Sequence, residues 1–259
     1  MDVLPFKAKA LNLCGGNWLA MNIMRYEAIL FDMDGVVVDT HQSVTTFWLR
    51  LAADHGISLT QQDFVQHVYG CTGEHTLRYL FPHLTEQQRQ AVYVTMEEYE
   101  RNLCYEAVPG VVDLLHDLRR EDIPTALVTS GTRSKVGAVT SQLGIDGYFT
   151  AQVTFEDIRY GKPDPECYLL AARLLNVSPH ACIVFEDAVN GIQAAVAAGT
   201  HCIGIQAAYN TAPLMEVGAQ AVVPDFTAVT LQVTPQEGPA LAVESQVKVH
   251  IPLMSNQGL

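Results

Sequence analysis

The sequence predicts an α/β fold in which a parallel sheet forms the core and a small helical cap domain is inserted after the first strand. Short β-branched runs alternate with helical patterns along most of the chain, which is typical of a parallel sheet with crossover helices on both faces. Residues 41–107 break this alternation, because they contain helical patterns alone. The chain has 259 residues, of which 49 % are hydrophobic, enough to bury a substantial core. We therefore expect a Rossmann-like sheet core with a cap.

The predicted strands are apolar runs that end in polar residues, as expected for strands buried on both faces. They are AILFD (28–32), TALVTS (125–130), CIVFED (182–187) and CIGI (202–205). The predicted helices between them carry apolar residues at spacings of three and four, and two of them end in a glycine suited to a C-cap. These helices cover residues 110–122, 132–144, 165–175 and 188–199.

These elements divide the chain into four parts. We expect a core of residues 25–40 and 108–230, with a helical cap of residues 41–107. Residues 1–24 contain only a broken apolar stretch and are expected to lie outside the fold, with a start at Met21 or Met24 left open. Residues 231–259 show no sustained period, so a mobile tail is expected there.

Charge and cysteine content narrow the range of partners. The formal net charge of −13 argues against nucleic acid and against an anionic membrane surface. The six cysteines lack the spacing of zinc or redox sites, and no apolar stretch approaches the roughly 18 residues of a membrane span. We expect a cytoplasmic monomer or weak dimer that acts on a small molecule. An anionic substrate would need positive charge supplied locally by the site.

Polar side chains gather at the predicted carboxyl ends of the strands, where open α/β sheets bind their ligands. They are Asp32 and Asp34 after the first strand, Thr129, Ser130 and Gly131 after the next, Glu186 and Asp187 after a later one, and Lys162 just before a helix. Turn formation alone does not predict acidic, hydroxyl and lysine side chains at one edge of a sheet. An active site does.

The chemistry that needs these residue types is phosphoryl transfer through a covalent aspartyl phosphate. Asp32 would attack phosphorus, and Asp34 would protonate the leaving oxygen and later activate water. Lys162 would neutralise the nucleophile and the transferring group. Thr129 or Ser130, with the backbone N–H groups that follow at Gly131 and the helix start, would hold the phosphate oxygens.

The same carboxylates predict a magnesium site. Several carboxylates gathered together repel one another unless a cation lies among them, and Mg²⁺ binds through one or two carboxylates, a carbonyl and water. We expect Asp32, the main-chain carbonyl of Asp34, and Asp187 as ligands. Glu186 is expected to help through water or from behind these ligands.

Four stretches resemble the ordered motifs of the haloacid dehalogenase (HAD) superfamily: FDMDGVVVDT, LVTSGT, YGKPDPECYLLAA and VFEDAVNGIQAAVAAG. The resemblance covers roughly residues 26–230. It is strongest to the branch of sugar- and polyol-phosphate phosphatases and β-phosphoglucomutases, whose members carry a helical cap in this position. It implies a Mg²⁺-dependent HAD-type phosphatase that hydrolyses small phosphomonoesters, with a sugar or polyol phosphate as substrate.

Two alternatives remain open. A β-phosphoglucomutase-type phosphomutase would share Val36, but the positions where such caps carry histidine, arginine and lysine hold Val44, Gly73 and about Met96 here. A bisphosphate needs cations in the cap, and no lysine occurs between His41 and Pro109. The cap does contain arginines, at Arg50, Arg78, Arg89 and Arg101. A non-catalytic, regulatory HAD-like protein that binds a sugar phosphate is less expected, because no motif residue is missing.

The loop YGCTGEHT (69–76) of the cap is expected to cover the site and select the substrate. Glu74, His75 or Thr72 would then contact sugar hydroxyls. The structural alternative is a helix start, with Thr72 or Gly73 as the N-cap of a helix containing HTLRYL.

Overall fold

The computed structural model describes residues 26–206, 211–234, 238–244 and 248–254. Its core is a six-stranded parallel sheet in the order β3-β2-β1-β4-β5-β6, which confirms the predicted α/β fold. The strands are β1 (Ala28–Phe31), β2 (Thr125–Val128), β3 (Ala151–Val153), β4 (Cys182–Glu186), β5 (His201–Ile205) and β6 (Ala221–Val223). Residues 1–24, predicted to lie outside the fold, are outside the described residues.

The strand order brings the predicted polar side chains together. β1 lies between β2 and β4, and Phe31 pairs with Leu127 on one side and with Phe185 on the other. Every residue of these three strands is buried, as expected for strands covered on both faces. The residues that follow the three strands therefore share one edge of the sheet.

Helices cover both faces of the sheet. Successive apolar residues of β1 point to opposite faces, so both faces must be shielded from water. Ile29 and Phe31 pack with one layer, which includes α5 (Val111–Arg120) and α6 (Arg133–Leu143). Ala28 and Leu30 pack with the other layer. That layer contains α7 (Glu166–Leu174), α8 (Val189–Ala197) and α9 (Ala212–Glu216). Three short 3-10 helices complete the connections: η1 (Phe155–Asp157), η2 (Pro179–Ala181) and η3 (Phe226–Ala228).

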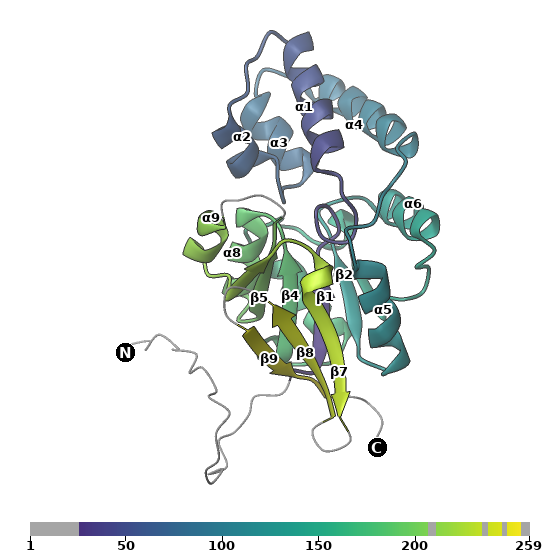
Figure 1. Cartoon of the computed structure of the whole chain (residues 1–259). Helices are drawn as coiled ribbons and strands as arrows, with labels where there is room; N and C mark the ends of the chain where they lie inside the picture. The colour runs from purple at the N-terminus through teal and green to yellow at the C-terminus, as the bar shows by residue number, and fades with distance from the viewer. Residues whose placement is uncertain (1–25, 207–210, 235–237, 245–247, 255–259) are drawn as a thin grey trace.

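Four helices follow β1 and form a group of their own at one end of the sheet (Figure 1). They are α1 (His41–Asp54), α2 (Gln61–His67), α3 (Gly73–Leu80) and α4 (Glu86–Arg101). They pack around a separate apolar cluster that includes Trp48, Phe64 and Phe81. We refer to this group as the cap. In the described part of the chain, no helix combines the length and apolar character needed to cross a membrane.

The C-terminal region differs from the mobile tail that the sequence predicts over residues 231–259. A three-stranded antiparallel sheet forms there in the order β7-β8-β9, from β7 (Val229–Thr234), β8 (Gly238–Glu244) and β9 (Lys248–Pro252). Leu241 is fully buried and belongs to the same apolar cluster as Phe31. The prediction is corrected for these strands: they are short and carry no long period, yet they pack on one face of the core.

Candidate active site

Asp32 lies directly after β1 and pairs with a buried lysine. Lys162 Nζ is 2.5 Å from Asp32 Oδ1 and 2.6 Å from Glu186 Oε1, and it also donates to the Val128 carbonyl at 3.3 Å. Lys162 is 2 % exposed and Asp32 is 4 % exposed. Burial lowers the pKa of Lys162, but Asp32 and Glu186 raise it well above its usual value. The side chain therefore stays an ammonium ion, fixed beside the predicted nucleophile.

Glu186 at the end of β4 holds this lysine rather than opening toward the cavity. Its Oε1 accepts hydrogen bonds from Lys162 and, at 2.6 Å, from the Tyr168 hydroxyl. Its Oε2 accepts from the backbone N–H groups of Asp187 at 3.1 Å and Ala188 at 3.3 Å. Both oxygens are thus engaged, and the side chain is fully buried.

Asp187 completes a cluster of three carboxylates. Oxygen atoms of Asp32, Glu186 and Asp187 lie within 4.8 Å of one another. Burial raises the pKa of Asp32 to about 7, and burial with the neighbouring Glu186 raises that of Asp187 well above its usual value. Among the described residues, none donates a hydrogen bond to the Asp187 carboxylate. Carboxylate oxygens crowded in this way around one lysine fit a divalent cation such as Mg²⁺.

Gly35 allows the first motif to approach Asp187. Its φ of +79° lies in the left-handed region, and a Cβ there would come within 2.0 Å of Asp187 Oδ2. The backbone next to the Asp34 carbonyl therefore lies against the Asp187 carboxylate. Any larger residue would displace one of the two predicted metal-binding elements.

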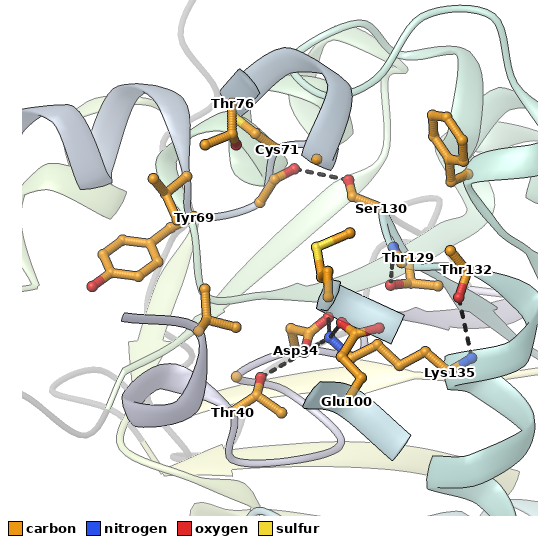
Figure 2. Close-up of a pocket in the computed structure, with 18 of the residues that line it drawn as sticks. Asp34, Thr40, Tyr69, Cys71, Thr76, Glu100, Thr129, Ser130, Thr132 and Lys135 are labelled. Carbon is orange, nitrogen blue, oxygen red and sulfur yellow. Dashed lines mark hydrogen bonds and ion pairs between the residues drawn. The ribbon is translucent and has the colours of Figure 1, made fainter. Parts of the chain in front are cut away.

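Asp34 faces the cavity and has partners different from those of Asp32. Its Oδ1 accepts a hydrogen bond from Thr40 Oγ1 at 2.6 Å. Lys135 Nζ donates to Oδ1 at 2.7 Å and lies 3.0 Å from Oδ2. Lys135 also lies 3.1 Å from Glu100 Oε1, and Figure 2 shows these four side chains directed toward one another. The two aspartates therefore have different cationic partners, Lys162 for Asp32 and Lys135 for Asp34.

The loop after β2 leads into the N-terminus of α6. Thr129 Oγ1 accepts a hydrogen bond from the Gly131 N–H at 2.9 Å, and Thr132 caps the helix through the Lys135 N–H at 3.2 Å. Ser130 Oγ instead donates to the Gly70 carbonyl of the cap at 2.9 Å (Figure 2). Thr129, Ser130 and Gly131 all line the cavity, but only the Ser130 hydroxyl is bonded to the cap.

The cavity of about 130 Å³ lies between the sheet edge and the cap. It is smaller than the roughly 300–1,000 Å³ of sites for drug-sized ligands. The sheet side contributes both aspartates of the first motif and Asp187, and the cap side contributes His41, Trp48, Tyr69, Glu74, Tyr93, Met96 and Glu100. Lys135 is the single lysine or arginine among the lining residues of the described chain.

The residues of the cap loop 69–76 have two different roles. Thr72 caps α3, because its hydroxyl accepts a hydrogen bond from the His75 N–H at 3.2 Å. Glu74 lines the cavity, whereas His75 pairs with His67 at 3.1 Å and is absent from the lining. Of the three side chains predicted to contact substrate, Glu74 is thus the one that lines the cavity.

A family model for haloacid dehalogenase-like hydrolases matches residues 26–199, which contain the sheet edge, the cap and all of the site residues above. The chain belongs to the haloacid dehalogenase-like hydrolase family. The resemblance inferred from the four motifs is confirmed. The enzyme class predicted from them, a phosphoric monoester hydrolase, agrees with the phosphatases among the relatives.

The relatives of this HAD-like hydrolase include several phosphatases. Hexitol phosphatase A of Escherichia coli is 34 % identical, over 75 % of this chain and 89 % of its own length. Validoxylamine A 7'-phosphate phosphatase of Streptomyces hygroscopicus subsp. limoneus is 32 % identical, over 79 % of this chain and 96 % of its own length. A phosphorylated carbohydrates phosphatase of Thermotoga maritima is 33 % identical, over 76 % of this chain and 94 % of its own length.

Solved structures share the same architecture. A hydrolase from Pseudomonas syringae superposes on the HAD-like hydrolase with a TM-score of 0.70 and 26 % identity, covering 77 % of this chain and 94 % of that one. A structure assigned as a β-phosphoglucomutase from Bacteroides vulgatus also gives a TM-score of 0.70, with 29 % identity. The match covers 79 % of this chain and 86 % of that one. The sequence relatives above are phosphatases, and the structural neighbours include a protein assigned as a β-phosphoglucomutase.

The residues that surround Asp34, namely Thr40, Lys135 and Glu100, were not predicted from the sequence as part of the site. One indication was available. Lys135 lies in the first turn of α6, where the helix macrodipole disfavours a positive charge and where no acidic residue offsets it. A lysine in that position points to a partner elsewhere, although the sequence does not say which one.

Proposed function

We propose that this chain is a Mg²⁺-dependent phosphatase that hydrolyses small phosphomonoesters, with sugar or polyol phosphates as its substrates. The observation that carries the proposal is the buried Lys162 between Asp32 and Glu186, whose carboxylates lie with that of Asp187 in a cluster of oxygens within 4.8 Å of one another. It pairs a nucleophile with fixed positive charge where phosphorus would lie. The names of the phosphatase relatives support the same substrate class.

Asp32 would act as nucleophile in the first half of the reaction. One of its oxygens bonds to phosphorus while the bond from phosphorus to the leaving oxygen breaks, and Asp34 gives that oxygen a proton. In the second half, water attacks the aspartyl phosphate, Asp34 takes the proton, and inorganic phosphate leaves. Lys162 offsets the charge of the transferring group throughout, because its ammonium is held in place before substrate arrives.

Asp32, Asp187 and the Asp34 carbonyl would hold Mg²⁺, which when bound supplies positive charge for the phosphate oxygens. Glu186 supports this site by fixing Lys162 and the start of the following loop, since both of its oxygens already accept hydrogen bonds. Thr129 and the N–H groups at the start of α6 would hold the phosphate oxygens. Ser130 stands beside them, with its hydroxyl on the cap.

The charge of the cavity favours a monophosphate over a bisphosphate. Lys135, the one lysine or arginine among the described residues that line the cavity, is already paired with Asp34 and Glu100. The cap adds Glu74 as a further carboxylate on the substrate side. A second phosphate would therefore meet the carboxylate of Glu74 without an unpaired lysine or arginine among the described lining residues, whereas the hydroxyls of a sugar or polyol can donate to Glu74. This supports a phosphatase rather than a phosphomutase.

We expect the enzyme to act in the cytoplasm as a monomer or weak dimer. The cysteines in the described part of the chain, from Cys71 to Cys202, are all free, which fits a reducing compartment.

The test is phosphate release from hexose, pentose and polyol phosphates, with isomerised sugar phosphate measured in parallel and a bisphosphate primer included. We expect release that needs Mg²⁺, stops with EDTA and falls by at least about 1,000-fold in Asp32→Asn, which keeps the shape but loses the nucleophile. Nearly intact activity in Asp32→Asn would contradict the mechanism. Primer-dependent interconversion with little free phosphate would replace the phosphatase with a mutase.

A further inference from the structure

Lys135 is a buried cation with no role in the mechanism above. It lies in the first turn of α6, and its side chain is 5 % exposed. Its ammonium group contacts both oxygens of Asp34 and, at 3.1 Å, Oε1 of Glu100. An ammonium ion has three N–H donors, and these three oxygens match them in number. Burial lowers the pKa of Lys135, but Asp34 and Glu100 raise it more, so the side chain remains charged.

Helix stability does not account for either member of the Lys135–Glu100 pair. Lys135 stands at the N-terminal end of α6, and Glu100 is the second-last residue of α4. The macrodipole disfavours a cation at the first position and an anion at the second. Both charges are therefore placed against the field of their own helix, and it is their mutual contact that stabilises them.

The pair also joins two parts of the molecule. Glu100 belongs to the cap, whereas Asp34, which follows β1, and Lys135, in α6 after β2, belong to the core. Thr40, at the start of the cap, holds the same Asp34 oxygen from another direction at 2.6 Å. The position of the Asp34 carboxylate is thus set by contacts that depend on where the cap lies.

We propose that Lys135 is a positioning residue that couples the closed cap to Asp34. With the cap closed, Glu100 holds the Lys135 ammonium, which together with Thr40 fixes the Asp34 carboxylate toward the cavity. With the cap withdrawn, Lys135 loses Glu100 and Asp34 is held less firmly. The role of Asp34 in proton transfer rests on the proposed function, but the link between Glu100 and the cap does not.

The first experiment measures the link without relying on activity. Amide hydrogen exchange of the cap loop (69–76) and of the end of α4 is compared in the wild type, Lys135→Met and Glu100→Gln. We expect exchange to rise by about three- to tenfold in both variants, since each removes a buried ion pair between cap and core. Arg133→Met is the matched control: it removes a charge from the same turn of α6, but its ion pair with Asp157 lies at the surface. Unchanged exchange in Glu100→Gln, which keeps the side-chain shape, would overturn the coupling.

The second experiment tests whether Lys135 acts through Asp34. Lys135→Met should lower kcat by about 10- to 100-fold with KM changed by less than about threefold, because a misplaced acid/base costs the chemical step more than binding. In an Asp34→Asn background the same substitution should cost less than about twofold, because the group that it positions is gone. p-Nitrophenyl phosphate serves as the substrate in both backgrounds. Its leaving group needs little proton assistance, so the loss in kcat reports the second half of the reaction, in which Asp34 takes a proton from the attacking water.

The two experiments distinguish a failure of the positioning role from a failure of the proposed function. Equal losses in both backgrounds would show that Lys135 supports the fold and would overturn the positioning role. A wild-type enzyme that releases no phosphate from any substrate would overturn the proposed function, and the exchange measurements would still decide the coupling of cap and core.

Discussion

At the scale of single residues, the carboxylates at the edge of the sheet depend on the buried cation Lys162. Lys162 is 2 % exposed and lies between Asp32 and Glu186, with the Tyr168 hydroxyl on the same glutamate oxygen. A buried ion pair contributes modestly to stability when complete, because desolvation opposes the attraction between its members. Removing one member is costly, since the other charges stay buried without compensation.

Lys162→Met should therefore lower both stability and activity. We expect the free energy of unfolding to fall by about 3–5 kcal/mol, since two buried carboxylates lose their cation. Phosphate release should fall by at least about 100-fold, because the transferring group loses a fixed positive charge. Urea unfolding and initial rates check the two effects. Arg120→Met is the control, since it removes a cation whose side chain is 58 % exposed; equal losses in the two variants would contradict the assigned role of Lys162.

Which residues could be predicted depended on whether the strand–helix pattern alone places them at the edge of the sheet. Asp32, Asp187 and Lys162 stand at strand ends or just before a helix, so the α/β pattern alone brings them to one edge. The Asp34–Lys135 contact joins residues 101 positions apart, and Glu100 reaches it only because the cap docks on α6. Sequence periodicity indicates each helix, but it does not give the rotation and position at which one helix packs on another.

At the scale of elements, the C-terminal sheet packs on the same face of the core sheet as α5 and α6. Its middle strand, β8, pairs with β7 and β9, and Leu241 enters the cluster that contains Phe31 and Phe226. Tyr26, just before β1, donates to the Pro252 carbonyl at 2.9 Å. The sheet is thus joined to the first core strand by hydrogen bonds as well as by apolar packing. Each of the three strands is short, so the sequence pattern of this region is not distinguished from that of a tail.

Leu241→Ala tests whether this sheet is part of the core. The side chain is fully buried, so we expect a loss of about 2–5 kcal/mol in the free energy of unfolding, from the lost apolar contact and the cavity left behind. Val233→Ala on β7 is the matched control, because that side chain is 49 % exposed and should change stability by less than about 0.5 kcal/mol. Urea unfolding measures both. A loss in Leu241→Ala no larger than that of the control would mean that the sheet does not stabilise the core.

At the scale of the whole molecule, cap and core meet around the cavity through polar contacts. Asn190 Nδ2, at the start of α8, lies 3.3 Å from the carbonyls of Val65, Gln66 and Tyr69 near the end of α2. Ser130 holds the next turn of the cap at Gly70. Contacts of this kind to backbone carbonyls are exchangeable with water, so they suit a cap that must open for substrate and product.

Metal binding should stabilise the folded molecule as a whole. A ligand at 100 times its dissociation constant adds about 2.7 kcal/mol to the free energy of unfolding, because it binds the native state alone. We expect Mg²⁺ to raise the thermal midpoint of the wild type and to leave that of Asp187→Asn unchanged. Asp113→Asn, an exposed carboxylate on α5, is the control and should respond as the wild type does. An equal rise in all three proteins would place the ion elsewhere.

Ser130→Ala distinguishes the closing of the cap from the binding of phosphate. The sequence predicts that Thr129 or Ser130 holds the phosphate oxygens, whereas the structure gives the Ser130 hydroxyl a partner in the cap at Gly70. Losing one hydrogen bond of about 1 kcal/mol should raise KM by about fivefold and leave competitive inhibition by inorganic phosphate within twofold. Thr129→Val, next to the Gly131 N–H, should weaken phosphate inhibition instead. If phosphate inhibition weakens about tenfold in Ser130→Ala, the hydroxyl must turn from the cap to the phosphate when substrate binds. The contact with Gly70 would then be one that catalysis breaks, and the cap would be held closed by Asn190 and Lys135.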